Sequence, residues 1–168
     1  MLIVQMHGLP GSGKSTIARA LGAKLPAVVL DKDVIKAAML SGGIEESLAA
    51  PGAYDVYFDL AESFALQGYP LILDNPVFWP RVEQRWREVC ERHNTPLRMI
   101  ECVCPDQDEL RRRLATRDAL VSQQRVPFTQ RAEPGYVPSC ERLTIDTTRP
   151  LTDVVAQALA YVRQAVPA

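Results

Sequence analysis

The chain lacks any apolar run of the roughly 20 residues that a membrane-spanning helix needs, and its first residues lack the basic segment of a secretory leader. It also lacks an excess of charge, because 19 Lys and Arg nearly balance 20 Asp and Glu, for a net charge of −1. A near-neutral chain offers little to coat a polyanion such as nucleic acid, although a local groove could still hold one nucleic-acid end. These absences favour a cytoplasmic globular protein.

Paired cysteines are also missing. The four cysteines form no C-x-x-C motif, and no histidine has metal-ligand spacing to them. Cys102 and Cys104 alternate in the apolar run MIECVC, so both face one side of a strand. We expect buried, reduced thiols. The guanine-specific N-K-x-D pattern is absent as well, which disfavours a GTPase-like switch and leaves ATP as the default nucleotide.

What the chain does have is a regular alternation of apolar, strand-like runs and helical patterns. Strands are expected at residues 2–6, 27–30, 71–73, 97–104 and 143–145, and helices at 14–24, 33–41, 53–67, 80–93, 106–118 and 151–165. Strands that are apolar along their whole length indicate a parallel sheet covered on both faces. The length suits one domain, so we expect residues 1–168 to form one α/β/α sandwich around a five-stranded parallel sheet.

The strongest motif is GLPGSGKS, which matches G-x-x-x-x-G-K-[ST] between a predicted strand and a predicted helix. Glycines let consecutive backbone N–H groups point at phosphates, and the helix start adds its positive dipole end. Lys14 is expected to reach the β- and γ-phosphates, and the Ser15 hydroxyl to ligate Mg²⁺. A glycine-rich turn without a ligand is the alternative. The expected nucleotide-binding residues are Gly8, Leu9, Pro10, Gly11, Ser12, Gly13, Lys14, Ser15 and Thr16.

Two aspartates follow predicted strands at the edge where ligands bind in open α/β sheets. Asp74 ends the run LILDN, the usual place for a carboxylate that holds Mg²⁺, although it could instead cap the strand end. Asp33, in LDKDVIK, could accept the proton of an attacking hydroxyl. The alternative for the second motif is that Asp31 or Asp33 caps the following helix.

Arginines follow in DELRRRLATR. Arg113 and Arg117 stand four residues apart on the predicted helix and so share a face, where they could grip a transferring phosphate. A solvated helix face is the alternative. Residues 119–142 carry three prolines and no clean period, and a loop this long is usually functional or disordered. We expect about 113–142 to form a lid or substrate loop that excludes water.

Together these motifs resemble the small P-loop kinases of the nucleoside and nucleotide kinase-like group. The most similar patterns are those of the polynucleotide 5′-hydroxyl kinases, the chloramphenicol phosphotransferases and the AAA_33-type ATP-binding proteins. The resemblance implies a P-loop NTPase sandwich that uses ATP and Mg²⁺. It implies that Asp33 is the general base and that Arg113 and Arg117 are lid arginines, with Arg113 also at the nucleotide. Lys36 stands where many members have a substrate-phosphate arginine, but a lysine cannot make a bidentate clamp. Asn75, followed by Pro76, resembles the D-T-N motif of the polynucleotide kinases only loosely.

Three functions compete. The sequence favours an ATP- and Mg²⁺-dependent kinase that phosphorylates a hydroxyl of a small-molecule or nucleoside-like acceptor, held by Asp33, Lys36, Asp74 and Asn75. A polynucleotide 5′-hydroxyl kinase and a nucleotide-binding regulatory module are the alternatives. The segment 37–59, with Tyr54, Tyr57 and Phe58, could wall a pocket for an uncharged acceptor or simply pack in the core. Phe78 and Trp79 allow the same two interpretations.

Overall fold

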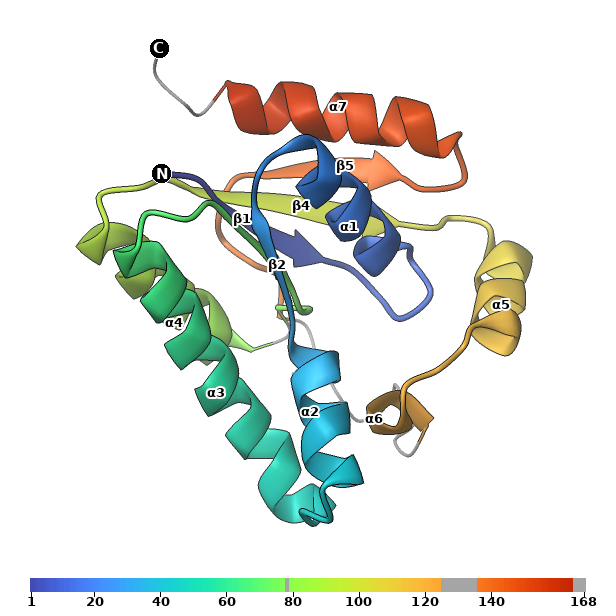
Figure 1. Ribbon diagram of the computed structural model, residues 1–168. Coiled ribbons are helices and arrows are strands. Elements are labelled where there is room, and N and C mark those ends of the chain that lie inside the picture. Colours follow the sequence, from blue (N-terminus) through green and yellow to red (C-terminus); the bar gives the residue numbers. More distant parts are fainter. Residues whose placement is uncertain (78, 125–135, 165–168) are drawn as a thin grey trace.

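A five-stranded, all-parallel sheet forms the centre of the protein (Figure 1). The computed structural model describes residues 1–77, 79–124 and 136–164. The strand order is β2-β3-β1-β4-β5. The strands are β1 (Ile3–His7), β2 (Val28–Asp31), β3 (Leu71–Asp74), β4 (Leu97–Val103) and β5 (Arg142–Asp146). The predicted five-stranded parallel sheet is confirmed.

The strand register brings the carboxyl ends together at one edge. Met6 pairs with Asp74, and Asp74 pairs with Asp31 on the next strand. The turn after β1 and the ends of β2 and β3 therefore lie side by side. The central strand β1 is flanked by β3 and β4, so the chain leaves it at a place where an open sheet offers a crevice for a ligand.

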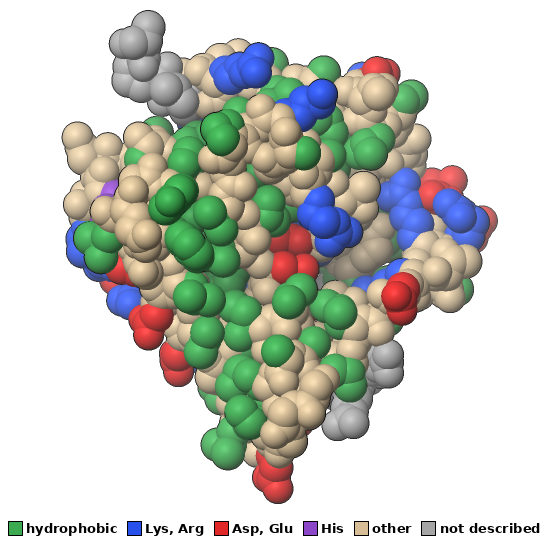
Figure 2. All heavy atoms as spheres, in the orientation of Figure 1, with side chains coloured by type: hydrophobic (Ala, Val, Ile, Leu, Met, Phe, Trp, Pro, Cys, Tyr) green, Lys and Arg blue, Asp and Glu red, His purple; other side chains and the backbone are tan. Residues whose placement is uncertain are grey.

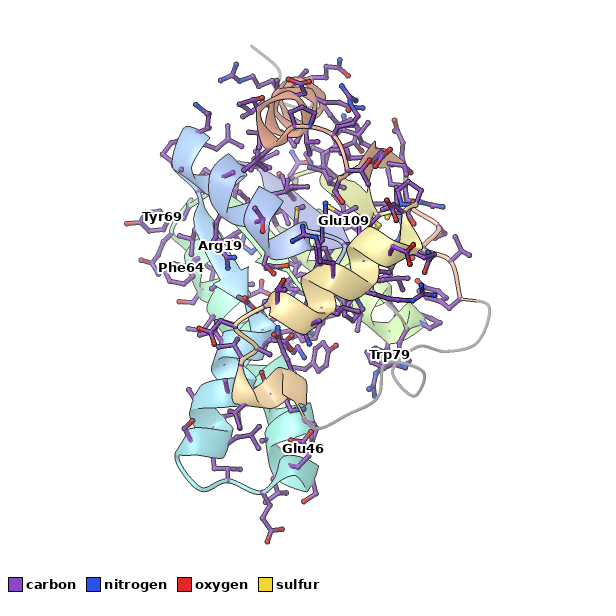
Figure 3. The ribbon with its side chains drawn as sticks, turned by 90° about the vertical axis from the view of Figure 1, so that its right-hand side faces the viewer. Arg19, Glu46, Phe64, Tyr69, Trp79 and Glu109 are labelled. Atoms are coloured by element: carbon purple, nitrogen blue, oxygen red, sulfur yellow. The ribbon has the colours of Figure 1, made fainter. Side chains whose placement is uncertain are left out.

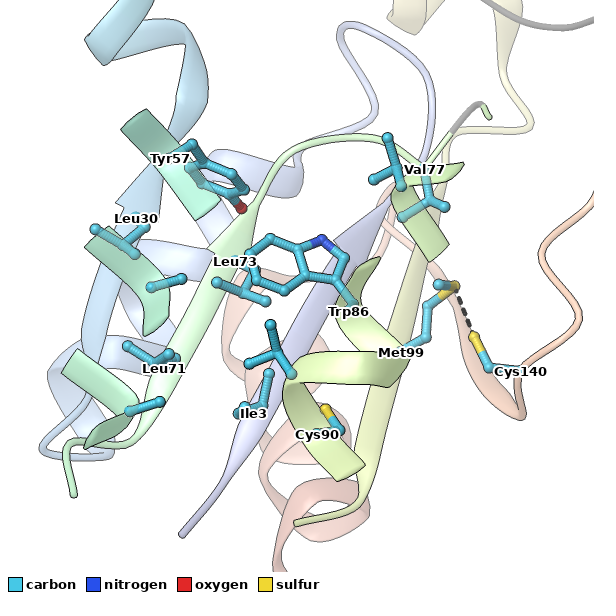
Figure 4. Packing of buried hydrophobic residues seen from close by; sticks show 14 residues of the cluster. Ile3, Leu30, Tyr57, Leu71, Leu73, Val77, Trp86, Cys90, Met99 and Cys140 are labelled. Carbon is cyan, nitrogen blue, oxygen red and sulfur yellow. Dashed lines mark hydrogen bonds between the residues drawn. The ribbon is translucent and has the colours of Figure 1, made fainter. Parts of the chain in front are cut away.

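Helices cover both faces of the sheet, as Figure 1 shows. They are α1 (Lys14–Lys24), α2 (Lys32–Ser41), α3 (Glu46–Leu66), α4 (Pro80–Arg92), α5 (Gln107–Thr116), α6 (Val121–Gln124) and α7 (Leu151–Arg163). Residues of α3 and α4, such as Tyr57 and Trp86, pack on one face of the sheet (Figure 4). Residues of α1 and α7, such as Leu21 and Val154, pack on the other. The predicted α/β/α layering is confirmed.

Most helix boundaries follow their sequence signals. The Asp106 carboxylate accepts hydrogen bonds from the N–H groups of Asp108 and Glu109 at the start of α5, as an N-cap does. Pro80 opens α4. Gly68 follows the end of α3 with a φ of 80°, a conformation that favours glycine.

The predicted start of α3 at residue 53 is wrong, because the helix begins at Glu46. It runs through Pro51 and Gly52, two residue types that disfavour helix interiors. Packing against α2 outweighs this local preference. A Cβ at Gly52 would lie 3.0 Å from the terminal methyl carbon of Met39 in α2, so this part of α3 contacts α2 through the end of a flexible side chain.

The region predicted as one irregular loop, 119–142, contains the short helix α6 and the start of β5, and residues 125–135 of it lie outside the described part. The chain that returns to β5 is held by Glu83 of α4. Its carboxylate accepts hydrogen bonds from the Tyr136 hydroxyl and from the N–H and hydroxyl of Ser139. These bonds hold the pKa of Glu83 near 2 despite its burial.

All four cysteines are buried and form no disulfide. Burial raises the pKa of the Cys102 thiol to about 12, so it stays protonated and unreactive near neutral pH. This agrees with the expected structural role. None of the helices in the described ranges is long and apolar enough to span a bilayer.

Candidate functional site

The loop after β1 has a backbone shape that requires glycine. Gly8, Gly11 and Gly13 have φ values of 131°, 81° and 87°, a region that other residues rarely adopt. At Gly8, a Cβ would also lie 2.2 Å from the Cys102 carbonyl oxygen on β4. Gly13 is the N-cap of α1. The motif therefore forms a tight turn that leads into a helix N-terminus, as its spacing predicted.

Lys14 and Ser15 begin α1 and line a cavity beside this loop. The Lys14 ammonium donates a hydrogen bond to the carbonyl oxygen of Leu9 at 3.4 Å. The Lys14 side chain thus lies back over its own loop. Thr16, on the next position of α1, lines the same cavity.

A partly buried carboxylate, Asp31, and a buried one, Asp74, lie side by side at the ends of β2 and β3. Burial raises the pKa of Asp74, and Lys14 and a hydrogen bond from Ser15 only partly oppose this. Burial and the charge of Asp74 raise the pKa of Asp31 to about 6. Asp31 also caps α2, accepting a hydrogen bond from the Asp33 N–H at 2.9 Å. The capping alternative is therefore correct for Asp31, and the Asp33 side chain is left for another role.

This pair of carboxylates and the Ser15 hydroxyl fit a divalent cation. Hard oxygen ligands suit Mg²⁺, which usually takes one or two protein carboxylates and fills its remaining positions with water and phosphate oxygens. A cation there would also offset the charge of Asp74, which adds to the effect of burial in raising the pKa of Asp31. Within the described ranges, no group of three or more His, Cys, Asp or Glu could hold a metal by itself. A metal here would take its remaining ligands from water or from a bound nucleotide.

Asp33 lies in the first turn of α2 and lines the same cavity. Its carboxylate lies 2.6 Å from the Lys32 ammonium and accepts a hydrogen bond from the Gln123 amide at 3.1 Å. Burial would raise the pKa of Asp33, but Lys32 and these hydrogen bonds hold it below its usual value. Asp33 is therefore ionised at neutral pH and able to accept a proton.

The two arginines that the sequence singled out lie at the C-terminal end of α5. Arg113 belongs to α5 and donates hydrogen bonds to Glu109, to the Thr147 hydroxyl at 3.0 Å and to the Thr147 carbonyl at 2.8 Å. Arg117 follows the end of α5 in an extended conformation. Its N–H donates a hydrogen bond to the Arg113 carbonyl oxygen at 3.1 Å, so α5 ends two residues before the predicted end at residue 118, and the expectation that the two arginines share a helix face stays a prediction. Both line the cavity.

Asn75 lies beneath the site. It is buried, and its side-chain oxygen accepts a hydrogen bond from the Tyr57 hydroxyl at 2.7 Å. It does not belong to the cavity lining, whereas Asp74 and Lys36 do. Three residues of the glycine-rich loop also do not line the cavity: Gly8, Leu9 and Ser12. The structure thus brings together most, but not all, of the residues expected at the site.

The cavity has a volume of about 610 Å³ and extends from the glycine-rich loop to α2, α3 and α6. Figure 2 shows a hollow on one face, with Lys, Arg and acidic side chains at its edge. The lining residues that sequence reasoning missed include Arg19, Glu46 and Gln123. Figure 3 shows Arg19 on α1 and Glu46 at the start of α3. No motif marks them, because their positions depend on how the helices pack.

Some of the aromatic residues line the cavity, and others pack in the core. Tyr54 and Trp79 line the cavity, with ring centroids 6.2 Å apart in an edge-to-face arrangement. Tyr57 and Phe58 instead pack against Trp86 at centroid distances of 5.4 and 4.6 Å. Phe78 lies outside the described residues.

A second cavity of about 400 Å³ adjoins Gly13 and Arg113. Its walls come from α1 (Thr16 and Ile17), from α5 and from the turn between β5 and α7. It therefore continues from the glycine-rich loop on the side away from α3. No sequence motif predicts this cavity.

The sheet order, the loop geometry and the lysine at the start of α1 together define a P-loop nucleotide-binding fold. A family model described as AAA domain (AAA_33) matches residues 3–133. This is more than half of the chain, and the chain belongs to that family. No curated protein matches the sequence.

Solved structures of similar fold cover nearly the whole chain. A provisionally assigned kinase from Chloroflexus aurantiacus J-10-fl has a TM-score of 0.76 at 20% identity, covering 98% of this chain and 97% of its own. The APS kinase of Mycobacterium tuberculosis, in complex with AMPPNP and APS, has a TM-score of 0.69 at 21% identity, covering 96% and 97%. A gluconokinase from Sinorhizobium meliloti 1021 has a TM-score of 0.60 at 18% identity, covering 98% and 93%. At these identities the likeness establishes the fold.

Proposed function

We propose that the protein is an ATP- and Mg²⁺-dependent kinase that transfers the γ-phosphoryl group to a hydroxyl of a small-molecule or nucleoside-like acceptor. One observation carries this proposal: a single cavity is lined by the phosphate-loop residue Lys14, by Asp33 and by Arg113 and Arg117. Phosphoryl transfer depends on such a combination of positioning, cations and a base at the attacking oxygen. The fold shared with an APS kinase and a gluconokinase supports the same class of reaction.

The two cavities suit the two parts of this reaction. The second cavity, beside Gly13 and Thr16, offers room for the base and ribose of ATP. The phosphates would then cross the glycine-rich loop, toward Lys14 and the N-terminus of α1. The acceptor would occupy the larger cavity, toward α2 and α3. Mg²⁺, held by Ser15 and Asp74, would neutralise phosphate charge.

Asp33 is the proposed base. It is ionised at neutral pH, and its carboxylate lines the larger cavity. To accept the proton of an acceptor hydroxyl, it would exchange its hydrogen bond from Gln123 for one from the acceptor. Lys14 and Arg117 would stabilise the charge on the transferred phosphoryl group.

The first test is transfer of the γ-phosphoryl label from ATP, with Mg²⁺, across a panel of acceptors. The panel holds nucleosides, sugars, aminocyclitol and phenicol antibiotics, and DNA and RNA oligonucleotides with 5′-hydroxyl ends. A labelled small alcohol would support the proposal. Label confined to oligonucleotide ends would replace it with a polynucleotide 5′-kinase. Phosphate released only to water would favour a nucleotide-hydrolysing regulatory module.

The second test separates the base from nucleotide binding. Asp33→Asn should lower kcat by about 10²- to 10⁴-fold while the Kd for ATP changes little, because Asp33 lies at the acceptor side. Asp55→Asn, on the exposed side of α3, is the matched control and should retain wild-type turnover. A kcat within a few-fold of wild type for Asp33→Asn would rule out this residue as the base.

A further inference from the structure

Lys36 and Glu46 form an ion pair inside the larger cavity. Lys36 comes from α2 and Glu46 from the first turn of α3, and both line the cavity. The Lys36 ammonium donates a hydrogen bond to Glu46 Oε1. The Lys36 side chain is only 8% exposed. Its charge is therefore neutralised within the protein rather than offered to a ligand.

The neighbouring cation is also paired. The charged lining residues of α2 and α3 are Lys32, Asp33, Lys36 and Glu46. Lys32 lies against Asp33 as Lys36 lies against Glu46, so this wall of the cavity carries no net charge. The other cationic lining residues belong to α1 or to the α5 side: Lys14, Arg19, Arg113 and Arg117.

An anionic acceptor would meet an unfavourable wall. To reach Lys36, a phosphate or carboxylate would have to displace Glu46, which would leave two negative groups close together in a partly desolvated site. Displacing the partner of a cation that is only 8% exposed is costly, because the charge in the low-dielectric surroundings is then uncompensated. Juxtaposed like charges at a binding site also select against the wrong partner.

The same wall of the cavity suits a neutral acceptor that carries hydroxyl groups. The Glu46 side chain is 36% exposed where it lines the cavity, and its Oε2 accepts no hydrogen bond from any residue in the described part of the chain. A carboxylate oxygen is an acceptor only, so it matches the O–H donor of a ligand. Ala50, Tyr54 and Trp79 line the same cavity and provide apolar surface for a carbon skeleton.

We infer that the Lys36–Glu46 pair makes the acceptor site selective for an uncharged polyhydroxy molecule, with an acceptor hydroxyl donating to the partly exposed Glu46 carboxylate. This inference rests on the proposed kinase activity and narrows its substrate class. Lys36 holds the Glu46 carboxylate in place, and Glu46 accepts the hydrogen bond that selects the acceptor.

The experiment compares matched neutral and anionic acceptors in the label-transfer assay. The pairs are ribose and ribose 5-phosphate, glucose and gluconate, and adenosine and 3′-AMP, with glucosamine as a cationic member. Each is assayed with the wild-type protein, with Glu46→Gln and with Glu45→Gln. The last is the matched control, because Glu45 is exposed, caps nothing with its side chain and does not line the cavity.

In the wild-type protein, kcat/KM for a neutral member should exceed that for its anionic partner by at least about tenfold. Glu46→Gln frees the Lys36 charge, so the ratio should fall by about tenfold or more. Glu45→Gln should leave the ratio unchanged. Circular dichroism and thermal unfolding would verify that both variants are folded. A purely structural Lys36–Glu46 pair would alter stability without altering this preference.

Three results would overturn the inference: preference for the anionic members, preference for glucosamine over glucose, or an unchanged ratio in Glu46→Gln. In each of these cases transfer is still observed, so the kinase proposal stands. Absence of label on every member, together with failure of the wild-type protein to bind ATP with Mg²⁺ in calorimetry, would reject the kinase proposal as well. ATP binding without label on any neutral member would reject the neutral-acceptor inference alone.

Discussion

The two ends of the cavity are built in different ways. At the phosphate end, the backbone determines the shape: glycines with positive φ form the turn after β1 and lead into α1. At the acceptor end, side chains from α2, α3 and α6 form ion pairs and hydrogen bonds across helices, such as Gln123 to Asp33. A backbone cradle suits a ligand portion common to many enzymes, whereas side-chain pairs can change with the acceptor.

The largest expected effect tests the phosphate end. Lys14→Ala should reduce turnover by about 10²-fold or more and weaken ATP binding, because the ammonium that offsets polyphosphate charge is removed. Both quantities are measured, turnover by label transfer and binding by calorimetry. Lys24→Ala, exposed at the far end of α1, is the matched control. Wild-type turnover in Lys14→Ala would mean that the loop does not bind the nucleotide phosphates.

A smaller effect is expected where the two ends meet. Arg113 bridges α5 and Thr147 and lines both cavities. Arg113→Ala should lower kcat/KM for ATP by about 10- to 100-fold, through lost charge stabilisation and a loosened wall of the second cavity. Arg111→Ala removes an arginine from the exposed side of the same helix, where it pairs with Asp108, and should behave as wild type. If the two variants are equally active, Arg113 has only a structural role.

The phosphate end was the more predictable one. The shape of the glycine-rich loop is predictable from the motif that contains Lys14 and Ser15, because one short segment supplies the turn, the N–H groups and the start of the helix. The alternation of apolar runs also predicted the sheet, since strands buried on both faces differ from amphipathic helices in pattern. Asp33 and Asp74 follow two of these runs, and the carboxyl ends of parallel strands meet at one edge, so the pattern alone predicts that the two aspartates lie near each other.

The acceptor end could not be derived in the same way. Glu46 meets Lys36 only because α3 begins seven residues before its predicted start and packs closely on α2 at Gly52. Pro51 gave the opposite local signal. Asn75, expected in the site, hydrogen-bonds with Tyr57 in the core beneath it. Such placements depend on long-range packing, which no local sequence pattern encodes.

The smallest expected effect concerns stability at the boundary between the two ends. Asp31 has a pKa of about 6 in the folded protein against 3.8 as its ordinary value. A raised pKa means that the folded state favours the protonated form. The stabilisation from that form is therefore complete below about pH 4 and is lost as the pH rises through about 6.

Asp31→Asn removes this titration while keeping a side chain that can cap α2. The variant should therefore gain stability over the wild type as the pH rises, by about 1–2 kcal/mol between about pH 4 and pH 7. Urea unfolding in EDTA without nucleotide is the measurement, because a bound divalent cation would itself relieve the Asp31–Asp74 repulsion. Asp59→Asn, on the exposed side of α3, should show no such trend. If the difference in the free energy of unfolding is the same at every pH, the Asp31 charge does not destabilise the folded state. If the difference disappears when Mg²⁺ and ATP are added, the cation binds beside Asp31 and Asp74.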